Sequence, residues 1–162
     1  MRIRVWATVA LAVGSAIAIA YPRAGANPDH VTACRLASPQ EISGAAGATV
    51  TRAVDRGTSG CTYNNGEDAS STETSVRVDT LDASAYDLDV AKWSANADAD
   101  DVSGLGVEAK YLVFQHQGVR TAVLIVKADA AHAFTVDIFP TTDRTSAIAV
   151  AELLLPRVQS GR

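Results

Sequence analysis

The sequence predicts an α+β fold: an antiparallel β-sheet packed with helices, in the order α-β-β-β-α-β-β-β-α, with one disulfide. Three observations lead to this prediction. Segments rich in β-branched residues alternate polar and apolar side chains, which is typical of half-buried strands. The connections at 117–118 and 128–132 are too short for the crossover that parallel strands require. Other segments repeat apolar residues at helical spacing.

The first helix has clear start and stop signals. Ser38 is a suitable N-cap, Pro39 follows at the first helical position, and Glu41 can complete a capping box with Ser38. Gly44 weakens the helix, and Gly47 is expected to end it.

Three short strands are predicted next, at 49–54, 60–63 and 74–80. Asn64-Asn65-Gly66 is a strong turn signal, and the polar segment 67–73 is expected to be an exposed loop. In the third strand, alternation places Val76 and Val78 inward and Arg77 and Asp79 outward.

A second helix is expected to begin at Asp82 or Ser84 and to run to about Ala97. Its predicted buried stripe recurs at helical spacing and consists of Tyr86, Val90, Trp93 and Ala97. The tract Asn96 to Asp101 is acidic and is interpreted as the solvated end of this helix.

Three more strands and a closing helix complete the fold. The strands are 110–116, 119–127 and 133–139, and the helix starts near Thr142 or Asp143. The middle strand is nearly all apolar, so we expect it in mid-sheet, covered on both faces. In the last strand Phe134, Val136 and Ile138 point inward, and Pro156 is expected to break or end the helix.

The N-terminus has the pattern of a signal peptide. Met1 to Arg4 is basic, Val5 to Ala20 carries no charge, and Ala24-Gly25-Ala26 fits the small-residue cleavage rule. We therefore predict a signal peptide at 1–26 and a single exported domain at 27–162, with its core at about 33–158. Cleavage after Ala20 and retention of the segment as a membrane anchor are the alternatives.

The charge of the predicted exported part disfavours some partners. Three of the 14 basic residues lie in the leader, which leaves 11 against 18 acidic residues, a net charge of −7. Nucleic acid and anionic lipid both require clustered Lys and Arg, so neither is an expected partner.

Cys34 and Cys61 are the two cysteines of the chain. Outside the cytosol the default for such a pair is a disulfide, and its loop would make it worth roughly 3 kcal/mol. The alternative is lipidation of Cys34, because Val31 to Cys34 loosely resembles a lipobox. Membrane contact is expected only if the leader is retained or Cys34 is lipidated.

Short motifs resemble a known group of proteins. They are Ala33-Cys34-Arg35-Leu36-Ala37-Ser38-Pro39-Gln40-Glu41-Ile42, then Gly60-Cys61-Thr62-Tyr63, then Gly104-Leu105-Gly106-Val107-Glu108-Ala109. Over about 33–158 the chain resembles the actinobacterial secreted and lipoprotein domains of unknown function that are common in mycobacteria. The resemblance implies a Cys34–Cys61 disulfide, an antiparallel sheet packed with helices, and no established activity. Unlike the lipoprotein members, this chain has no cysteine directly after the apolar run.

No catalytic or metal-binding motif is complete. The chain lacks the Gly-x-Ser-x-Gly elbow of many hydrolases, and His116 and His132 are expected to be solvated turn residues. The tract from Asn96 resembles the first half of a calcium loop, but Asp101 replaces the required Gly and Val107 the required Glu. No catalytic residue, cofactor or metal is therefore predicted.

The function predicted from these features is a non-catalytic exported module of the cell envelope that binds a protein, lipid or small molecule. The alternatives are a secreted hydrolase-like enzyme whose site combines His116, His132 and nearby acids, and an envelope scaffold or regulatory subunit.

Exposed loops carry function disproportionately, so the predicted partner contacts are Asn65, Gly66, Glu67, Gly104, Leu105 and Gly106. Tyr86 and Trp93 could line a ligand groove, although a core role is expected. A deep apolar cavity would favour a lipid or small-molecule carrier, whereas a filled core would favour contact with a protein.

Overall fold

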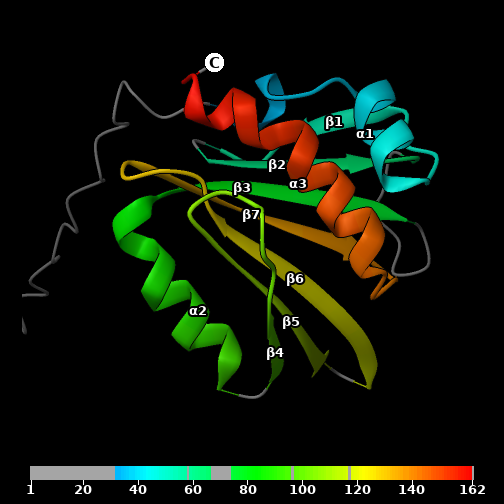
Figure 1. Cartoon of the computed structure of the whole chain (residues 1–162). Coiled ribbons are helices and arrows are strands. Elements are labelled where there is room, and N and C mark those ends of the chain that lie inside the picture. The colour runs from blue at the N-terminus through cyan, green and yellow to red at the C-terminus, as the bar shows by residue number, and fades with distance from the viewer. Residues whose placement is uncertain (1–31, 58, 67–73, 96, 117, 162) are drawn as a thin grey trace, which may run out of the picture.

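The computed structural model describes residues 32–57, 59–66, 74–95, 97–116 and 118–161. These residues form an α+β fold with one antiparallel sheet of seven strands and three α-helices (Figure 1). The strands are β1 (Arg52–Asp55), β2 (Gly60–Asn64), β3 (Ser75–Asp82), β4 (Ala97–Asp101), β5 (Glu108–His116), β6 (Val119–Lys127) and β7 (His132–Phe139). The helices are α1 (Pro39–Ala46), α2 (Tyr86–Ser94) and α3 (Arg144–Gln159).

The sheet consists of two meanders that meet at its centre, in the strand order β1-β2-β3-β7-β6-β5-β4. The last strand of the first meander, β3, pairs along its length with the last strand of the second, β7. Their register runs from Ser75 opposite Phe139 to Asp82 opposite His132. Side chains from both halves of the chain therefore lie beside one another at the β3–β7 pair.

Helices cover the two faces of the sheet unequally. On one face, α1 and α3 bury a continuous core that includes Val78, Leu124 and Val136, each at 0 % exposure. On the other face, α2 packs over β4, β5 and β6, where Leu112 and Ile125 are fully buried. Figure 1 shows α1 and α3 together and α2 apart from them. None of the helices within the described ranges is long and apolar enough to cross a membrane.

The predicted capping box at the start of α1 is present. The Ser38 hydroxyl accepts a hydrogen bond from the Glu41 backbone N–H at 3.3 Å, and the Ser38 backbone N–H donates to the Glu41 carboxylate at 2.8 Å. The helix ends at Gly47, as predicted. Both donors at this helix N-terminus are thereby satisfied by side chains.

The structure adds one strand to the predicted order. The acidic tract is not the end of a helix, because α2 ends at Ser94 and residues 97–101 form the edge strand β4. There Asp101 lies 2.5 Å from the Lys110 ammonium, and Asp100 lies 3.4 Å from the Arg144 guanidinium. The carboxylates therefore meet cations on β5 and α3 and do not oppose the dipole of a helix C-terminus.

The closing helix passes through Pro156, contrary to the prediction that this residue breaks or ends it. It continues to Gln159 with Pro156 inside the helix. Pro156 and Glu152 are both exposed, so water can reach the Glu152 carbonyl that lacks the proline N–H. The final turn is also held by Val158, which is 2 % exposed, and by the contacts of Arg157 described below.

Two other element boundaries differ from the prediction. The first strand is shorter than 49–54 at its start, because β1 begins at Arg52. The segment after β3 first forms a short 3-10 turn, Ala83–Ala85, and only then α2. Tyr86 and Val90 of the predicted stripe lie on α2 and pack against the sheet, whereas Ala97 belongs to β4.

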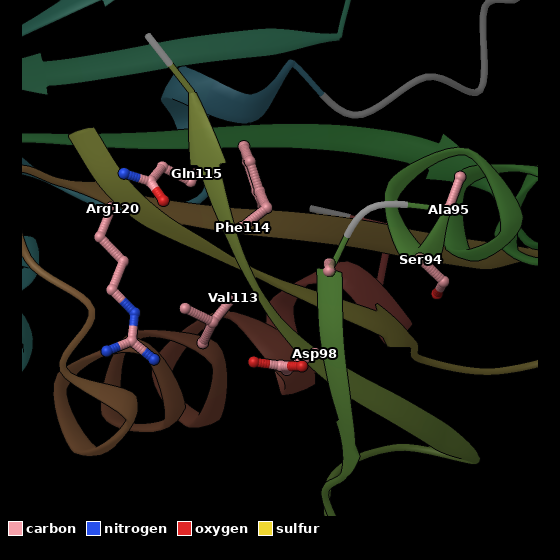
Figure 2. A pocket seen from close by; sticks show the side chains of 8 residues that line it. Ser94, Ala95, Asp98, Val113, Phe114, Gln115 and Arg120 are labelled. Atoms are coloured by element: carbon pink, nitrogen blue, oxygen red, sulfur yellow. The ribbon is translucent and has the colours of Figure 1, made fainter. Parts of the chain in front are cut away.

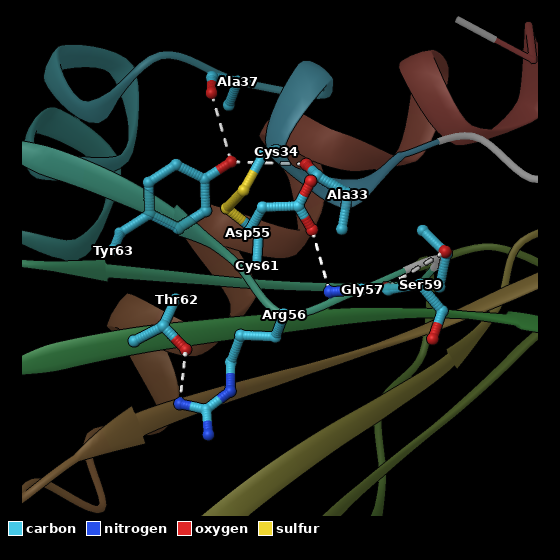
Figure 3. Close-up of a disulfide and its surroundings, with 11 residues drawn as sticks. Ala33, Cys34, Ala37, Asp55, Arg56, Gly57, Ser59, Cys61, Thr62 and Tyr63 are labelled. Carbon is cyan, nitrogen blue, oxygen red and sulfur yellow. Dashed lines mark hydrogen bonds between the residues drawn. A yellow bond between two sulfur atoms is a disulfide. The ribbon is translucent and has the colours of Figure 1, made fainter.

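The predicted disulfide joins Cys34 to Cys61 with a Cα–Cα distance of 5.0 Å (Figure 3). Cys34 lies in a 3-10 turn, Ala33–Arg35, just before α1, and Cys61 lies on β2. Beside it the buried Tyr63 hydroxyl donates to the carbonyls of Ala33 and Ala37, at 3.3 Å and 3.1 Å (Figure 3). The segment that leads into α1 is thus fixed to the sheet by a covalent bond and a buried hydroxyl.

Candidate functional site

The two predicted contact loops do not form one surface. Asn65 and Gly66 follow β2, at the end of the sheet where Asn64 is opposite Ser75 and Ser75 opposite Phe139. The loop at 104–106 precedes Glu108, which is opposite Lys127 at the other end of the sheet. Glu67 lies outside the described residues.

Leu105 offers little side-chain surface for the predicted contact. Its side chain is 3 % exposed and belongs to the core on the α1–α3 face of the sheet. Gly104 and Gly106 are exposed. The loop packs against β6, because the backbone N–H of Val107 donates to the Lys127 carbonyl at 2.8 Å.

The structure does not bring His116 and His132 together. His116 is paired with Val119 at one end of β5, whereas His132 starts β7 near Lys127, at the opposite end of the sheet. A strand of this length separates its ends by roughly 25 Å. The His132 ring lies 3.0 Å from the Asp129 carboxylate, which also accepts the backbone N–H of His132 at 2.8 Å, so both residues stabilise a turn.

The acidic tract does not have the shape of a calcium loop. Residues 97–101 are extended in β4, so Asp98 and Asp100 point to one face and Asp101 to the other. Within the described ranges no group of three His, Cys, Asp or Glu side chains is placed to hold a metal ion.

One hollow, of about 670 Å³, lies at the tips of β4, β5 and β6 (Figure 2). Its lining does not converge on one point. Val113, Asp98 and Arg120 point to one side of the sheet, whereas Phe114 points to the other (Figure 2). The hollow follows the end of the sheet and does not form a cleft within one face.

A second hollow, of about 330 Å³, lies beside α2 on the face opposite α3; we call it the α2 hollow. It is lined by Ser59, Arg77, Asp79, Leu81, Asp89, Lys92, Trp93, Val123, Thr135 and Asp137. These residues come from β3, β7, β6 and α2 and from the residue before β2, so the hollow requires the junction of the two meanders. Its size is at the lower end of the range for small-molecule pockets.

The strand register explains how this lining arises. Arg77 on β3 is opposite Thr62 on β2 and opposite Asp137 on β7, and Asp137 is opposite Val123 on β6. Residues directly opposite one another share a face of the sheet. Arg77 also donates to Asp79 of its own strand, from Nε at 2.7 Å and from Nη2 at 3.2 Å.

Asp137 is the most perturbed group of the α2 hollow. Burial raises the pKa of its carboxyl to about 6; Arg77 lowers this pKa, Asp79 raises it, and the Thr121 hydroxyl lowers it. Its Oδ1 atom is closed to solvent and has no hydrogen-bond partner. Such an unsatisfied acceptor is unfavourable for folding, and strongly perturbed acids gather at functional sites.

The two aromatic residues of α2 have different roles. Tyr86 is 1 % exposed, as expected for the core. Trp93 is half-buried; its ring lies 5.0 Å from that of Phe114, and its side chain also lines the α2 hollow. The groove role that the sequence left open for Trp93 therefore has a structural basis, whereas that for Tyr86 does not.

The sequence placed Arg77 and Asp79 on the outer face of their strand but did not single out Asp137. One signal was present, because Asp137 is the one acidic residue in the otherwise apolar or hydroxylated segment 133–139. A carboxylate in such a strand points either to solvent or to a polar site.

We compared the chain with protein-family models, with curated proteins and with solved structures, and no match was found in any of the three.

Proposed function

We propose that this protein is an exported, non-catalytic module of the cell envelope that binds a small molecule in the α2 hollow. One observation carries the proposal: Asp137, with a raised pKa and an unpartnered buried oxygen, lines a hollow large enough for a ligand. An Asn or Thr would be easier to bury at this position, so a binding role accounts for the carboxyl. The core under α3 is filled by fully buried side chains such as Leu124 and Leu154, which argues against a lipid carried there and is the outcome expected to favour contact with a protein. The small-molecule proposal therefore rests on the α2 hollow, which lies outside this core.

The export part of the proposal is supported by two features. The disulfide is compatible with an oxidising compartment outside the cytosol. The leader at 1–26, which lies outside the described residues, has the composition of a signal peptide. The proposed origin among actinobacterial secreted domains rests on the resemblance alone. Intact-mass measurement of the envelope or culture-medium form, with and without reductant and thiol alkylation, tests cleavage, lipidation and disulfide formation together.

Binding is tested by NMR with a fragment library that spans cations, anions, polyols and lipid-like molecules. We expect at least one class to shift the amide resonances of β3, β7 and α2 around the hollow, and Asp137→Ala to weaken these shifts. A library in which every class leaves these resonances unchanged, or shifts only the loops at 65–66 and 104–106, would contradict the proposed site.

A second candidate, a hydrolase, is favoured by one observation. Asp137, with a pKa of about 6, shares the hollow with Asp79, which is paired with Arg77. Enzymes that use acid–base catalysis often place two carboxyl groups in different environments, so that one acts as the acid and the other as the base. This candidate site differs from the His116 and His132 site considered from the sequence. Turnover of any member of a broad ester, glycoside and peptide panel, lost in Asp137→Asn, would favour it over the binding module.

A further inference from the structure

The charges of the α2 hollow do not balance once its internal ion pair is counted. Arg77 and Asp79 neutralise one another through two hydrogen bonds, at 2.7 Å and 3.2 Å. The ionisable side chains that remain are Asp137 on β7 and Asp89 and Lys92 on α2. Two carboxyls then share the space with one ammonium, so the lining carries one net negative charge when Asp137 is ionised.

The hollow also presents an acceptor that lacks a donor. Asp137 Oδ1 has no hydrogen-bond partner although it is buried. Because Oδ1 is closed to solvent, a ligand in the hollow can donate to it only after the carboxylate turns partway toward the hollow, about a terminal torsion that is soft in aspartate. A ligand that donates hydrogen bonds would remove this unsatisfied acceptor, whereas a ligand that only accepts them would not.

The aromatic wall of the hollow is compatible with positive charge. The Lys92 ammonium lies 5.2 Å from the centre of the Trp93 ring, which is within the range of a cation–π contact. Trp93 therefore tolerates a cation beside its ring, and its side chain lines the same hollow as Asp137.

We propose that the α2 hollow binds a small organic monocation whose ammonium group donates to the carboxylate of Asp137, an inference that rests on the binding function proposed above. The ammonium supplies the missing donor and the missing positive charge, and its alkyl part lies against Trp93, Leu81 and Val123. The volume of about 330 Å³ limits the ligand to a compact amine.

Binding of such a ligand depends on pH with a defined sign. Arg77, Asp79 and Thr121 interact with Asp137 and shift its pKa, and the other charged groups that line the hollow are Asp89 and Lys92 of α2. Burial raises the pKa of Asp137 to about 6, so most of the carboxyl is ionised at pH 7 and little of it at pH 5. Because the cation binds the ionised form, its affinity is expected to be roughly tenfold lower at pH 5 than at pH 7.

The test uses Trp93 as a reporter. The chain has two tryptophans, Trp6 and Trp93, so a full-length Trp6→Phe variant fluoresces from the hollow alone. This variant is titrated with n-butylammonium, n-butanol and butyrate at constant ionic strength, at pH 7 and pH 5. We expect a saturable change with n-butylammonium, with a dissociation constant on the order of 1 mM, and at least tenfold weaker responses to the other two. Asp137→Asn should abolish the response, while Asp87→Asn, a change at an exposed residue of α2, should leave it intact.

The outcomes separate this inference from the proposed function. If n-butanol or butyrate binds as tightly as n-butylammonium, and Asp137→Asn weakens that binding, the cation is the wrong class but the binding site stands. If n-butylammonium binds equally well to a folded Asp137→Asn variant, or equally at both pH values, the role of Asp137 is overturned. If no probe changes the fluorescence of Trp93 and the NMR library is also silent at the hollow, the inference and the proposed function fail together.

Discussion

The guanidinium of Arg157, near the end of α3, forms an ion pair with the carboxylate of Glu41 at the start of α1, with Nη2 2.5 Å from Oε1. The same guanidinium donates to the Leu36 carbonyl at 2.5 Å, and the same carboxylate accepts the Ser38 backbone N–H of the capping box. One ion pair thus fixes the N-terminal helix to the C-terminal one on the same face of the sheet. Together with the disulfide, it holds the first half of the segment before β1, from Cys34 to Glu41.

Replacement of Glu41 by Gln should destabilise the protein in a pH-dependent way. The hydrogen bond from Arg157 and those from Ser38 lower the pKa of Glu41 to about 2, from an ordinary value of 4.5. Because the folded pKa is depressed, the ionised carboxylate contributes stability that is complete above pH 4.5 and is lost as the pH falls toward 2. We expect Glu41→Gln to lower the thermal midpoint by a few degrees at pH 7 and by almost nothing near pH 2.

Glu152→Gln is the matched control, because Glu152 is an exposed glutamate of α3 with no part in this contact. It should change the thermal midpoint little at either pH. An equal loss in the two variants at pH 7 would show that the effect is one of net charge and not of the contact with Arg157.

Removal of the disulfide should cost about 3 kcal/mol of unfolding free energy, because the Cys34–Cys61 crosslink restricts the unfolded chain over a sequence separation of 27. In a Cys34→Ser, Cys61→Ser variant this corresponds to a fall in thermal midpoint of roughly 6–12 °C. The variant should still fold, since Tyr63 and Arg157 hold the same segment without the sulfurs. Urea unfolding of the variant beside the wild type, with and without reductant, measures the effect. If reductant leaves the wild type equally stable while the double variant is destabilised, the substitution by serine and not the loss of the crosslink causes the lower stability.

Most of the fold was predictable because its signals are local. The capping box of Ser38 and Glu41, the turn at Asn64 to Gly66 and the alternation around Val76 and Val78 each depend on a few neighbouring residues. β4, the first strand of the second meander, was not predictable in this way. Alternating Ala and Asp have low β-propensity, and the cations that pair with β4, Lys110 and Arg144, are distant in the sequence.

The candidate site was predictable only in its parts. Alternation placed Arg77 and Asp79 on the outer face of one strand, and the inward positions of Val136 and Ile138 imply that Asp137 points outward from another. Whether those outer faces become neighbours depends on the strand order, which places β3 beside β7 and not beside β5. Tertiary pairing of this kind has no signature within either strand, so the α2 hollow could not be derived from the sequence.

Asp137→Asn should stabilise the protein at neutral pH, in contrast to Glu41→Gln. Burial raises the pKa of Asp137 from 3.8 to about 6 in the folded state. The folded protein therefore holds this proton more tightly than the unfolded chain. Ionisation of Asp137 in the folded state therefore lowers the free energy of unfolding. This loss is absent below pH 3.8, grows between pH 3.8 and 6, and is complete above pH 6. The difference in unfolding free energy between variant and wild type should be near zero at pH 3 and reach up to about 3 kcal/mol at pH 7.

Urea unfolding across pH 3 to 8 measures this difference, with Asp87→Asn on α2 as the control. Asp87 is exposed, so its variant should follow the wild type across the range. A variant Asp137→Asn that is less stable than the wild type at pH 7 would mean that the carboxylate makes a favourable contact in the folded state, and the unsatisfied acceptor would no longer support a ligand site.

Gly106→Ala should destabilise the loop between β4 and β5. Gly106 has a φ of +66°, and a Cβ there would collide with the Lys127 carbonyl oxygen, which is backbone and cannot turn aside. The same carbonyl accepts the Val107 backbone N–H, so moving the loop also breaks that hydrogen bond. We expect a loss of roughly 1–3 kcal/mol, measured by urea unfolding.

Gly44→Ala is the opposite case: a Cβ on this exposed residue of α1 meets nothing within 4 Å, so Ala should raise stability by about 0.5–1 kcal/mol. Equal effects of the two substitutions would show that the loop is not held against β6 in solution.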